Sequence, residues 1–210
     1  MIEVAHIRQT DACYPDRLPY YLGEDAPATL SAVGNLKLLK TRPLALFCSR
    51  KCPGNLILET YDLAQKLREE GTAVIGGFHS PVERECLTIL LRGKNPIIIC
   101  LARGFERMRI PKEYTKPLDD GRLLLLSPFS DTTHRADKTL AVKRNAVVAA
   151  LADQVFVAHA ELGSKTDALC RDIVAWRKPL YVFDDFGNGD LLASGAKPAT
   201  ARGLLTEPRP

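Results

Sequence analysis

The sequence lacks a long apolar segment. No uninterrupted apolar run in its 210 residues approaches the ~18 residues that a membrane-spanning helix requires. The opening stretch, MIEVAHIRQTDACYPDR, carries charged residues in every short window and so lacks the apolar core of a signal peptide. We therefore expect a protein that does not contact a membrane and stays in the cytoplasm.

The sequence also has little excess of charge of one sign. Its net charge is +4, with 26% charged and 46% hydrophobic residues. These fractions are typical of a globular protein. A charge this small permits a nucleic acid or a nucleotide as partner but does not require one, because it cannot set up a surface of one sign.

The six cysteines form no Cys-x-x-Cys pair, and most of them lie inside apolar runs. This pattern favours reduced, buried thiols. Cys48 and Cys52 lie close together in the sequence, and with His79 they raise the question of a metal site. Zinc loops use paired short spacings, which this sequence does not have. We therefore expect no metal and no cofactor.

Apolar runs alternate with amphipathic helical patterns from residue 43 onward. Continuous apolar strands separated by such helices predict a parallel sheet covered on both faces. We expect an α/β fold with a doubly wound, mostly parallel, Rossmann-like sheet and helices on both faces. The expected strands lie within residues 43–49, 72–77, 96–102, 122–128, 154–160 and 179–185.

The chain divides into three parts on the basis of composition. Residues 1–40 read as an N-terminal lead-in packed on the core, with a short strand at IEVAHI, a turn at YPDRL and a short helix around PATLSAVGN. Residues 41–196 form the Rossmann-like domain. Residues 197–210 are rich in Pro and Ala, and we expect a flexible tail.

The stretch GGFHSPVEREC at residues 76–86 joins a strand, a glycine turn and a helix start. Ser80, Pro81 and Glu83 form a capping box with proline at the first helical position. Such a helix start offers free backbone N–H groups to an anion. In the alternative interpretation, Gly76 and Gly77 only allow the strand and the helix to pack closely.

A second strand-to-helix loop is ELGSKTDAL at residues 161–169. It is not a Walker A loop, because the order Gly-Lys-Ser/Thr and the upstream glycine are absent. Gly163, Ser164 and Thr166 are suited to bind phosphate through amides and hydroxyls. A capped helix that binds nothing fits the spacing equally well.

Arg144 falls on the apolar stripe of its predicted helix, with Leu140, Val147 and Leu151. An unpaired charge there is costly, so we expect its guanidinium to reach either a carboxylate or a bound phosphate. Arg103, Arg107, Arg109 and Lys112 read instead as a solvated basic loop.

Several motifs, taken in order, resemble the DNA-processing protein A (DprA/Smf) family, within the superfamily that it shares with the lysine-decarboxylase-like LOG proteins. YPDRL and PATLSAVGN are similar to the start of the family's domain, which has Tyr-Pro, a short linker and a small helix ending in Gly-Asn. ALFCSRK is similar to the family's strand that ends in Gly-Ser-Arg. LAVKRNAVVAALADQVFVAHAELGSKTDAL is similar to its Arg-Asn helix, strand and Gly-Ser-x-x-Thr turn, although Thr166 comes one residue early. GNGDLLASGA is similar to its Gly-x-Asn ending.

The sequence departs from the family pattern at three points. Cys48 occupies the place of the glycine before Ser49 and Arg50, and the loop after Gly77 is shorter than in the family. We find no helix-hairpin-helix or winged-helix segment, so we expect the binding core alone. The resemblance implies binding of single-stranded DNA and its transfer to a RecA-type recombinase, and a homodimer is a further expectation.

We therefore predict a nucleic-acid-binding protein that holds phosphates at the carboxyl edge of its sheet, with Phe78 and Phe105 as the aromatics for base stacking. The alternative is a LOG-like sensor or hydrolase of a nucleoside phosphate. The Pro-Gly-Gly-x-Gly-Thr turn and glutamate of those enzymes are not retained, so we expect no catalytic residues. The predicted phosphate-binding residues are Ser49, Arg50, Gly76, Gly77, His79, Ser80, Lys143, Arg144, Asn145, Gly163, Ser164, Lys165 and Thr166.

Overall fold

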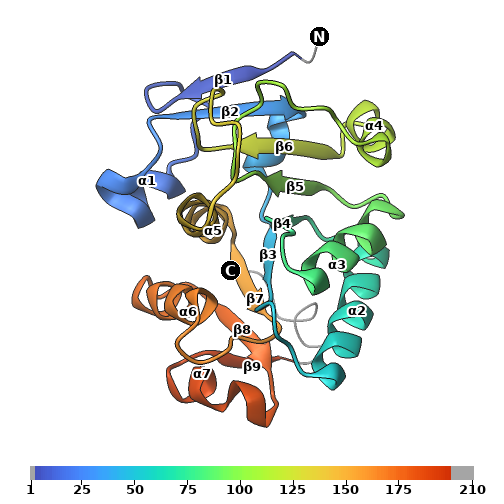
Figure 1. Ribbon diagram of the computed structural model, residues 1–210, viewed down its shortest axis with the longest axis vertical. Coiled ribbons are helices and arrows are strands. Elements are labelled where there is room, and N and C mark those ends of the chain that lie inside the picture. Colours follow the sequence, from blue (N-terminus) through green and yellow to red (C-terminus); the bar gives the residue numbers. More distant parts are fainter. Residues whose placement is uncertain (1–2, 200–210) are drawn as a thin grey trace.

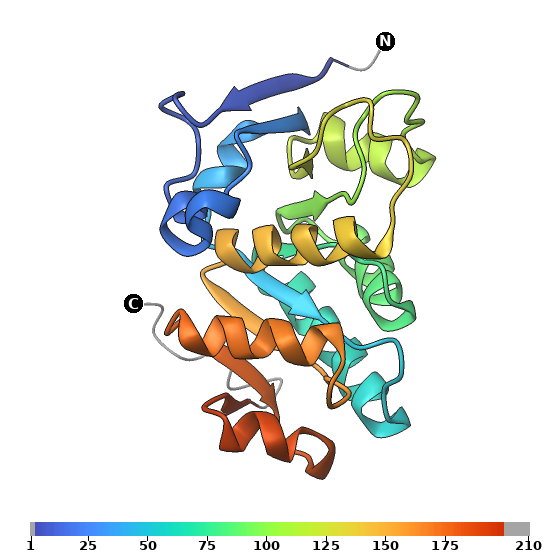
Figure 2. The same cartoon turned by 60° about the vertical axis from the view of Figure 1, so that its left-hand side comes forward.

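A computed structural model describes residues 3–199 and shows one nine-stranded sheet with helices on both faces (Figures 1 and 2). The strand order is β1-β2-β6-β5-β4-β3-β7-β8-β9. All neighbouring pairs from β6 to β9 are parallel, whereas β1 and β2 join as antiparallel strands at one edge. The strands are β1 Ala5–Arg8, β2 Thr29–Gly34, β3 Leu44–Phe47, β4 Val74–Gly76, β5 Ile97–Cys100, β6 Leu123–Ser127, β7 Gln154–Val157, β8 Leu180–Phe183 and β9 Lys197–Ala199.

The predicted doubly wound, Rossmann-like α/β fold is confirmed. Each of the six apolar runs forms a strand, and each is buried along its whole length. The connecting helices carry their apolar residues at helical spacing toward the sheet. The helices are α1 Arg17–Leu22, α2 Gly54–Glu69, α3 Pro81–Leu91, α4 Lys112–Asp119, α5 Lys138–Leu151, α6 Lys165–Ala175 and α7 Gly189–Ala193, with short 3-10 turns at Gly23–Asp25, Leu36–Lys40 and Phe186–Asn188.

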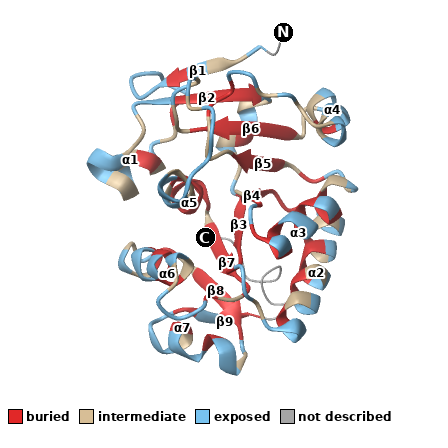
Figure 3. Cartoon of the chain, viewed as in Figure 1, coloured by how far each residue is buried: buried red, intermediate tan, exposed pale blue. Residues whose placement is uncertain are grey.

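The two faces of the sheet have separate hydrophobic cores. One core lies under α1, α5, α6 and α7 and includes Val148, Ile173 and Leu191. The other lies under α2, α3 and α4 and includes Leu63 and Leu90. Figure 3 shows the strands as the buried layer and the exposed outer faces of the helices. A parallel sheet needs this double cover because both of its faces are apolar.

The segment PATLSAVGN contains a strand, and the predicted short helix there is wrong. β2 pairs with β1 on one side and with β6 on the other, and Ser31, Ala32 and Val33 are buried. Two strands supply the backbone hydrogen bonds of this segment, so tertiary pairing overrides the weak local preference of small residues.

No helix within residues 3–199 is long and apolar enough to cross a membrane.

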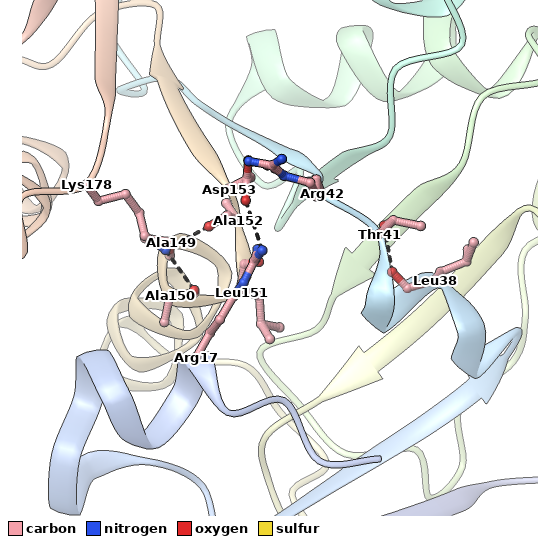
Figure 4. A network of polar contacts seen from close by, with 10 residues as sticks. All are labelled: Arg17, Leu38, Thr41, Arg42, Ala149, Ala150, Leu151, Ala152, Asp153 and Lys178. Atoms are coloured by element: carbon pink, nitrogen blue, oxygen red, sulfur yellow. Dashed lines mark hydrogen bonds and ion pairs between the residues drawn. The ribbon is translucent and has the colours of Figure 1, made fainter. Parts of the chain in front are cut away.

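A polar network joins the N-terminal segment to the C-terminal end of α5 (Figure 4). Asp153 accepts a hydrogen bond from Arg17 at 2.9 Å and another from Arg42 at 2.8 Å. The ammonium of Lys178 donates to the carbonyls of Ala149, Ala150 and Ala152 at 2.7–2.8 Å. These contacts satisfy carbonyls that the end of a helix leaves without a partner. The first residues of the predicted flexible tail, Lys197–Ala199, form β9, which pairs with β8. Residues 200–210 of that tail lie outside the described residues.

Candidate functional site

A cavity of about 500 Å³ opens at the carboxyl edge of the sheet. Its wall is formed by the segments that follow β3, β4, β5, β6 and β7, which is where ligands bind in open α/β folds. The lining residues are Cys48, Arg50, His79, Ser80, Glu83, Ala102, Ala136, Asp137, Lys138, Ala141, Arg144, Asn145, Lys165 and Thr166.

This cavity brings together many of the predicted phosphate-binding residues from distant parts of the chain. Arg50, His79, Ser80, Arg144, Asn145, Lys165 and Thr166 all line it. Ser49 and Ser164 do not line the cavity, and their hydroxyl oxygens lie 3.4 Å apart. Lys143 is exposed on α5 but does not line the cavity, and neither do Gly76, Gly77 and Gly163.

Arg144 is the buried cation of the site, with only 4% of its surface exposed. Its Nη1 donates to the carbonyls of Cys100 at 2.8 Å and Gly77 at 3.2 Å, and its Nε donates to Asn145 Oδ1 at 2.7 Å. None of the ion pairs found within residues 3–199 includes Arg144. Of the two expected partners, a carboxylate or a phosphate, the carboxylate is absent from these ion pairs. Backbone carbonyls fix the guanidinium instead, without neutralising it.

Gly77 is required by the approach of this guanidinium. A Cβ atom at position 77 would lie 1.9 Å from Arg144 Cζ. At Gly76 a Cβ would lie 3.0 Å from the ring of Phe78. The space beside Gly77 is thus taken by a guanidinium, and not by the close packing of strand and helix that the alternative interpretation describes.

The start of α3 does not offer the free amides that the sequence predicts. Ser80 forms the capping box with Glu83, as expected. However, the Glu83 carboxylate also accepts from the N–H groups of Cys48 at 3.0 Å and His79 at 2.8 Å. Because Glu83 itself occupies the positive end of the helix, an anion has no free amide at His79, and that part of the prediction is wrong.

The start of α6 is organised in a similar way. Gly163 N–H donates to Asp167 Oδ2 at 2.9 Å, and Ser164 caps the helix by accepting from Asp167 N–H at 3.1 Å. Ser49 Oγ accepts from Glu161 N–H at 3.1 Å, which ties the loop after β3 to the loop after β7. The loop is thereby held in place with the side chain of Lys165 at the cavity wall.

The charge of the lining is predominantly positive. Lys138, which the sequence analysis missed, begins α5 directly after its cap, and Lys165 Nζ donates to the Lys138 carbonyl at 3.1 Å. The signal in the sequence was the Asp137 cap, which places the first turn of α5 at the sheet edge. The cationic lining residues are Arg50, Lys138, Arg144 and Lys165, and the acidic ones are Glu83 and Asp137.

The two predicted stacking aromatics are not available to a ligand. Phe78 and Phe105 are each only 5% exposed and belong to the core under α2, α3 and α4. The assignment of both residues to base stacking is therefore wrong. Within residues 3–199, no group of three or more His, Cys, Asp or Glu side chains is placed to hold a metal ion.

The sequence model described as DNA recombination-mediator protein A matches residues 5–207. The chain belongs to this family. A solved structure of DNA processing protein A from Streptococcus pneumoniae superposes with a TM-score of 0.81 and 24% identity, covering 98% of this chain and 74% of that one. A structure of DNA processing protein A from Helicobacter pylori, described as having a unique single-stranded DNA binding mode, superposes with a TM-score of 0.77 and 22% identity. The match covers 97% of this chain and 94% of that one.

The fold extends beyond the family. A molybdenum cofactor binding protein from Rippkaea orientalis superposes with a TM-score of 0.54 at 14% identity, covering 79% of this chain and 94% of that one. A search of curated proteins gives no match. At these identities the structural likeness shows the shared fold, and family membership rests on the sequence model.

Proposed function

We propose that this chain binds a single-stranded nucleic acid, foremost single-stranded DNA, through its phosphates at the cavity on the sheet edge. The observation that carries the proposal is Arg144, a buried cation held at the cavity wall by two carbonyls and paired with no carboxylate within residues 3–199. A buried charge without an opposite charge is costly. A phosphate oxygen in the cavity supplies that opposite charge, and Arg50, Lys138 and Lys165 add further cations around it.

The acidic residues of the lining support binding rather than hydrolysis. The Glu83 carboxylate accepts hydrogen bonds from the backbone N–H groups of Cys48, His79 and Ser80, and Asp137 caps α5 by accepting from Leu140 N–H at 2.7 Å. These bonds give both carboxylates a structural role, because each one holds the start of a helix. Membership of a DNA recombination-mediator family makes DNA the first ligand to test.

The test is the affinity for a single-stranded oligonucleotide at several salt concentrations. For about three neutralised phosphates, the slope of log affinity against log salt is expected near −2, at about −0.7 per phosphate. The variants Arg50→Ala and Lys165→Ala should each weaken binding and bring the slope closer to zero by about 0.7. Lys40→Ala is the matched control, because Lys40 is exposed and precedes β3 at the opposite edge.

Two results would contradict the proposal. The first is no binding of the oligonucleotide even at low salt. The second is binding in which the Arg50 and Lys165 variants behave like the Lys40 variant while remaining folded. The second result would show that the phosphates bind elsewhere than in this cavity.

A nucleoside phosphate is the second candidate ligand, and the volume of the cavity favours it. About 500 Å³ falls within the range of small-molecule pockets, roughly 300–1,000 Å³. A ligand that binds only the native state raises the melting temperature. The alternative would be supported by a mononucleotide that raises the melting temperature of a chain to which no oligonucleotide binds.

The RecA-type recombinase partner and the homodimer stay predictions. Sedimentation of the chain alone tests the dimer. Binding of a RecA-type recombinase to the chain, with and without an oligonucleotide, tests the partner. Both measurements are independent of the cavity variants.

A further inference from the structure

A second cavity, of about 490 Å³, opens at the same edge of the sheet, and we call it the His6–Phe129 pocket. Its walls are β1, β2 and the segment that follows β6 (Figure 1). Because β2 runs antiparallel to β6, the first residues of β2 lie beside the carboxyl end of β6. The segment after β6 lines both cavities, the pocket with residues 128–131 and the first cavity with residues 136–138. A ligand that follows this segment out of the first cavity therefore reaches the pocket.

Both ring nitrogens of His6 are in contact with neighbouring side chains. Nδ1 lies 3.2 Å from Ser31 Oγ, and Nε2 lies 3.4 Å from Asp131 Oδ2. Ser31 is buried, whereas the His6 side chain is 51% exposed. Contacts on two sides hold this ring in one orientation although half of it faces solvent. A flat ligand that stacks on the ring thus pays little to order it.

Phe129 supplies a second aromatic ring to the pocket, in a turn that is also fixed. Its N–H donates to Ser127 Oγ at 3.2 Å, and Ser127 Oγ donates to the Arg103 carbonyl at 2.8 Å. Phe129 is half-buried, whereas Phe78 and Phe105 are enclosed in the core. The first cavity is lined by no Phe, Tyr or Trp from residues 3–199. Since single strands are held by cations on their phosphates and by rings on their bases, the pocket supplies what the first cavity lacks.

The segment between the two cavities lies against the loop that follows β5. Gly104 N–H donates to the Thr133 carbonyl at 2.8 Å, and Glu106 N–H donates to the Asp131 carbonyl at 3.2 Å. A Cβ atom at Gly104 would collide with the backbone of Asp131. Residues 103–109 and 131–135 therefore form one closely packed surface between the cavities, which we call the shelf.

The shelf exposes Arg107, Arg109 and Arg135. None of the ion pairs found within residues 3–199 includes Arg109 or Arg135, and Arg107 makes one contact of 3.9 Å with its neighbour in the sequence. On the other side of the first cavity, the loops after β7 and β8 expose Glu161 and Asp184. Phosphates are attracted to the cationic side and repelled from the acidic side. A strand therefore leaves the first cavity across the shelf.

We propose that the His6–Phe129 pocket is a second nucleic-acid subsite, in which a base of the bound strand stacks on His6 and Phe129. The arginines of the shelf neutralise the phosphates that lead to it. This inference rests on the proposed function, because the first cavity holds another part of the same strand. It specifies the ligand as a strand of several nucleotides, since a mononucleotide does not reach from one cavity to the other.

The first test compares a short oligonucleotide of about three nucleotides with a long one of about ten, a length typical of single-strand-binding sites. Arg107→Ala and Arg109→Ala should leave affinity for the short one unchanged. Each should weaken binding of the long one and bring its salt slope closer to zero by about 0.7. Arg50→Ala should weaken both. Arg177→Ala is the matched control, because Arg177 is exposed and precedes β8 at the opposite edge.

The second test assigns the base contact to His6. His6→Ala should weaken binding of the long oligonucleotide about tenfold, or about 1.4 kcal/mol, without changing the salt slope near pH 8, where free imidazole is mostly neutral. His6→Phe should restore the affinity, because it returns a ring. Removing single bases from the oligonucleotide should cost the wild type the same factor at one position and cost His6→Ala nothing there. Tyr20→Ala is the control, since Tyr20 is an aromatic residue 78% exposed on α1.

The outcomes separate this inference from the proposed function. No binding of either oligonucleotide to the wild type overturns both. The second subsite alone is overturned if Arg50→Ala weakens binding while the shelf and His6 variants behave like the Arg177 and Tyr20 controls. Equal affinity of the wild type for the short and the long oligonucleotide also overturns it. A His6→Ala variant that loses affinity but keeps the penalty for the missing base shows an indirect effect and overturns the base contact.

Discussion

At the scale of single residues, the contact between Gly77 and Arg144 decides what either position can hold. A Cβ at position 77 would lie 1.9 Å from Arg144 Cζ, so Gly77→Ala must displace the guanidinium or the turn. We expect a loss of about 1–3 kcal/mol in the free energy of unfolding, as for other overpacked sites. Oligonucleotide affinity should fall as well, because the displaced guanidinium leaves the cavity wall. Urea denaturation and a binding titration measure the two effects.

Gly54→Ala is the matched control for this change. Gly54 begins α2, and an added Cβ there meets no atom within 4 Å. The same substitution should therefore be neutral or stabilise the chain by up to about 1 kcal/mol. Equal effects at positions 54 and 77 would show that the contact with Arg144 has no energetic weight.

The residue scale is also where sequence reasoning reached its limit. Ser80 was correctly predicted as a helix cap, and the loop that contains Ser164 was correctly predicted to lead into a helix, because helix starts have local signals. The acidic residue three positions after each cap then takes up amides that an anion was expected to use. Phe78 was assigned to stacking from its place in the turn, but its burial depends on packing that no local pattern specifies.

At the scale of secondary-structure elements, Lys178 stabilises the C-terminal end of α5. Burial lowers its pKa to about 7, and nearby Arg17 acts in the same direction. The unfolded chain, with an ordinary pKa of about 10.5, binds more protons than the folded chain between these two values. The contribution of Lys178 to the free energy of unfolding should therefore rise with pH from about 7 to 10.5, by at most ~1.4 kcal/mol per pH unit.

The variant Lys178→Met tests this pH dependence. Methionine fills a similar length but does not titrate and leaves the three carbonyls without a donor. Unfolding in urea at several pH values above 7 should show the wild type gaining stability relative to the variant as the pH rises. Lys40→Met, at an exposed lysine, should leave the profile parallel to the wild type. A Lys178 variant whose profile is also parallel would contradict the assigned burial effect.

Elements differ in how far the sequence determines them. The central strands were predicted because each is an apolar run with both faces buried, and this pattern is local. β2 was missed because TLSAVG combines small and polar residues, and its strand form depends on hydrogen bonds to β1 and β6. Lys138 was missed for a similar reason, since only the crossover from β6 places the start of α5 at the cavity.

At the scale of the whole molecule, the question is whether residues 1–40, proposed as a lead-in packed on the core, unfold together with residues 41–196. The hairpin of β1 and β2 extends the central sheet at β6. Arg17 of α1 bonds Asp153 at the end of α5, and Asp153 has only 13% of its side chain exposed. These contacts couple the N-terminal segment to both the sheet and the helix layer (Figure 4).

The single tryptophan can report this coupling. Trp176 follows α6, and its ring centroid lies 5.4 Å from that of Tyr21 in α1. Its fluorescence therefore follows the contact between the first and last thirds of the chain, whereas far-ultraviolet circular dichroism follows all helices and strands. We expect the two urea transitions to coincide, as they do in a two-state unit. A fluorescence transition at lower urea would show that the N-terminal segment detaches first.

Asp153→Asn provides the perturbation that makes this measurement decisive. The substitution removes the charge that Arg17 and Arg42 share, so the free energy of unfolding should fall by about 1–3 kcal/mol. If the chain is one cooperative unit, both transitions shift together, because the lost contacts stabilise the whole fold. Glu69→Gln is the control, since its pair with Arg68 is exposed and should contribute less than about 1 kcal/mol. α5 also carries Arg144. A segment that detaches in the Asp153 variant would therefore remove contacts from the helix that holds the proposed phosphate site.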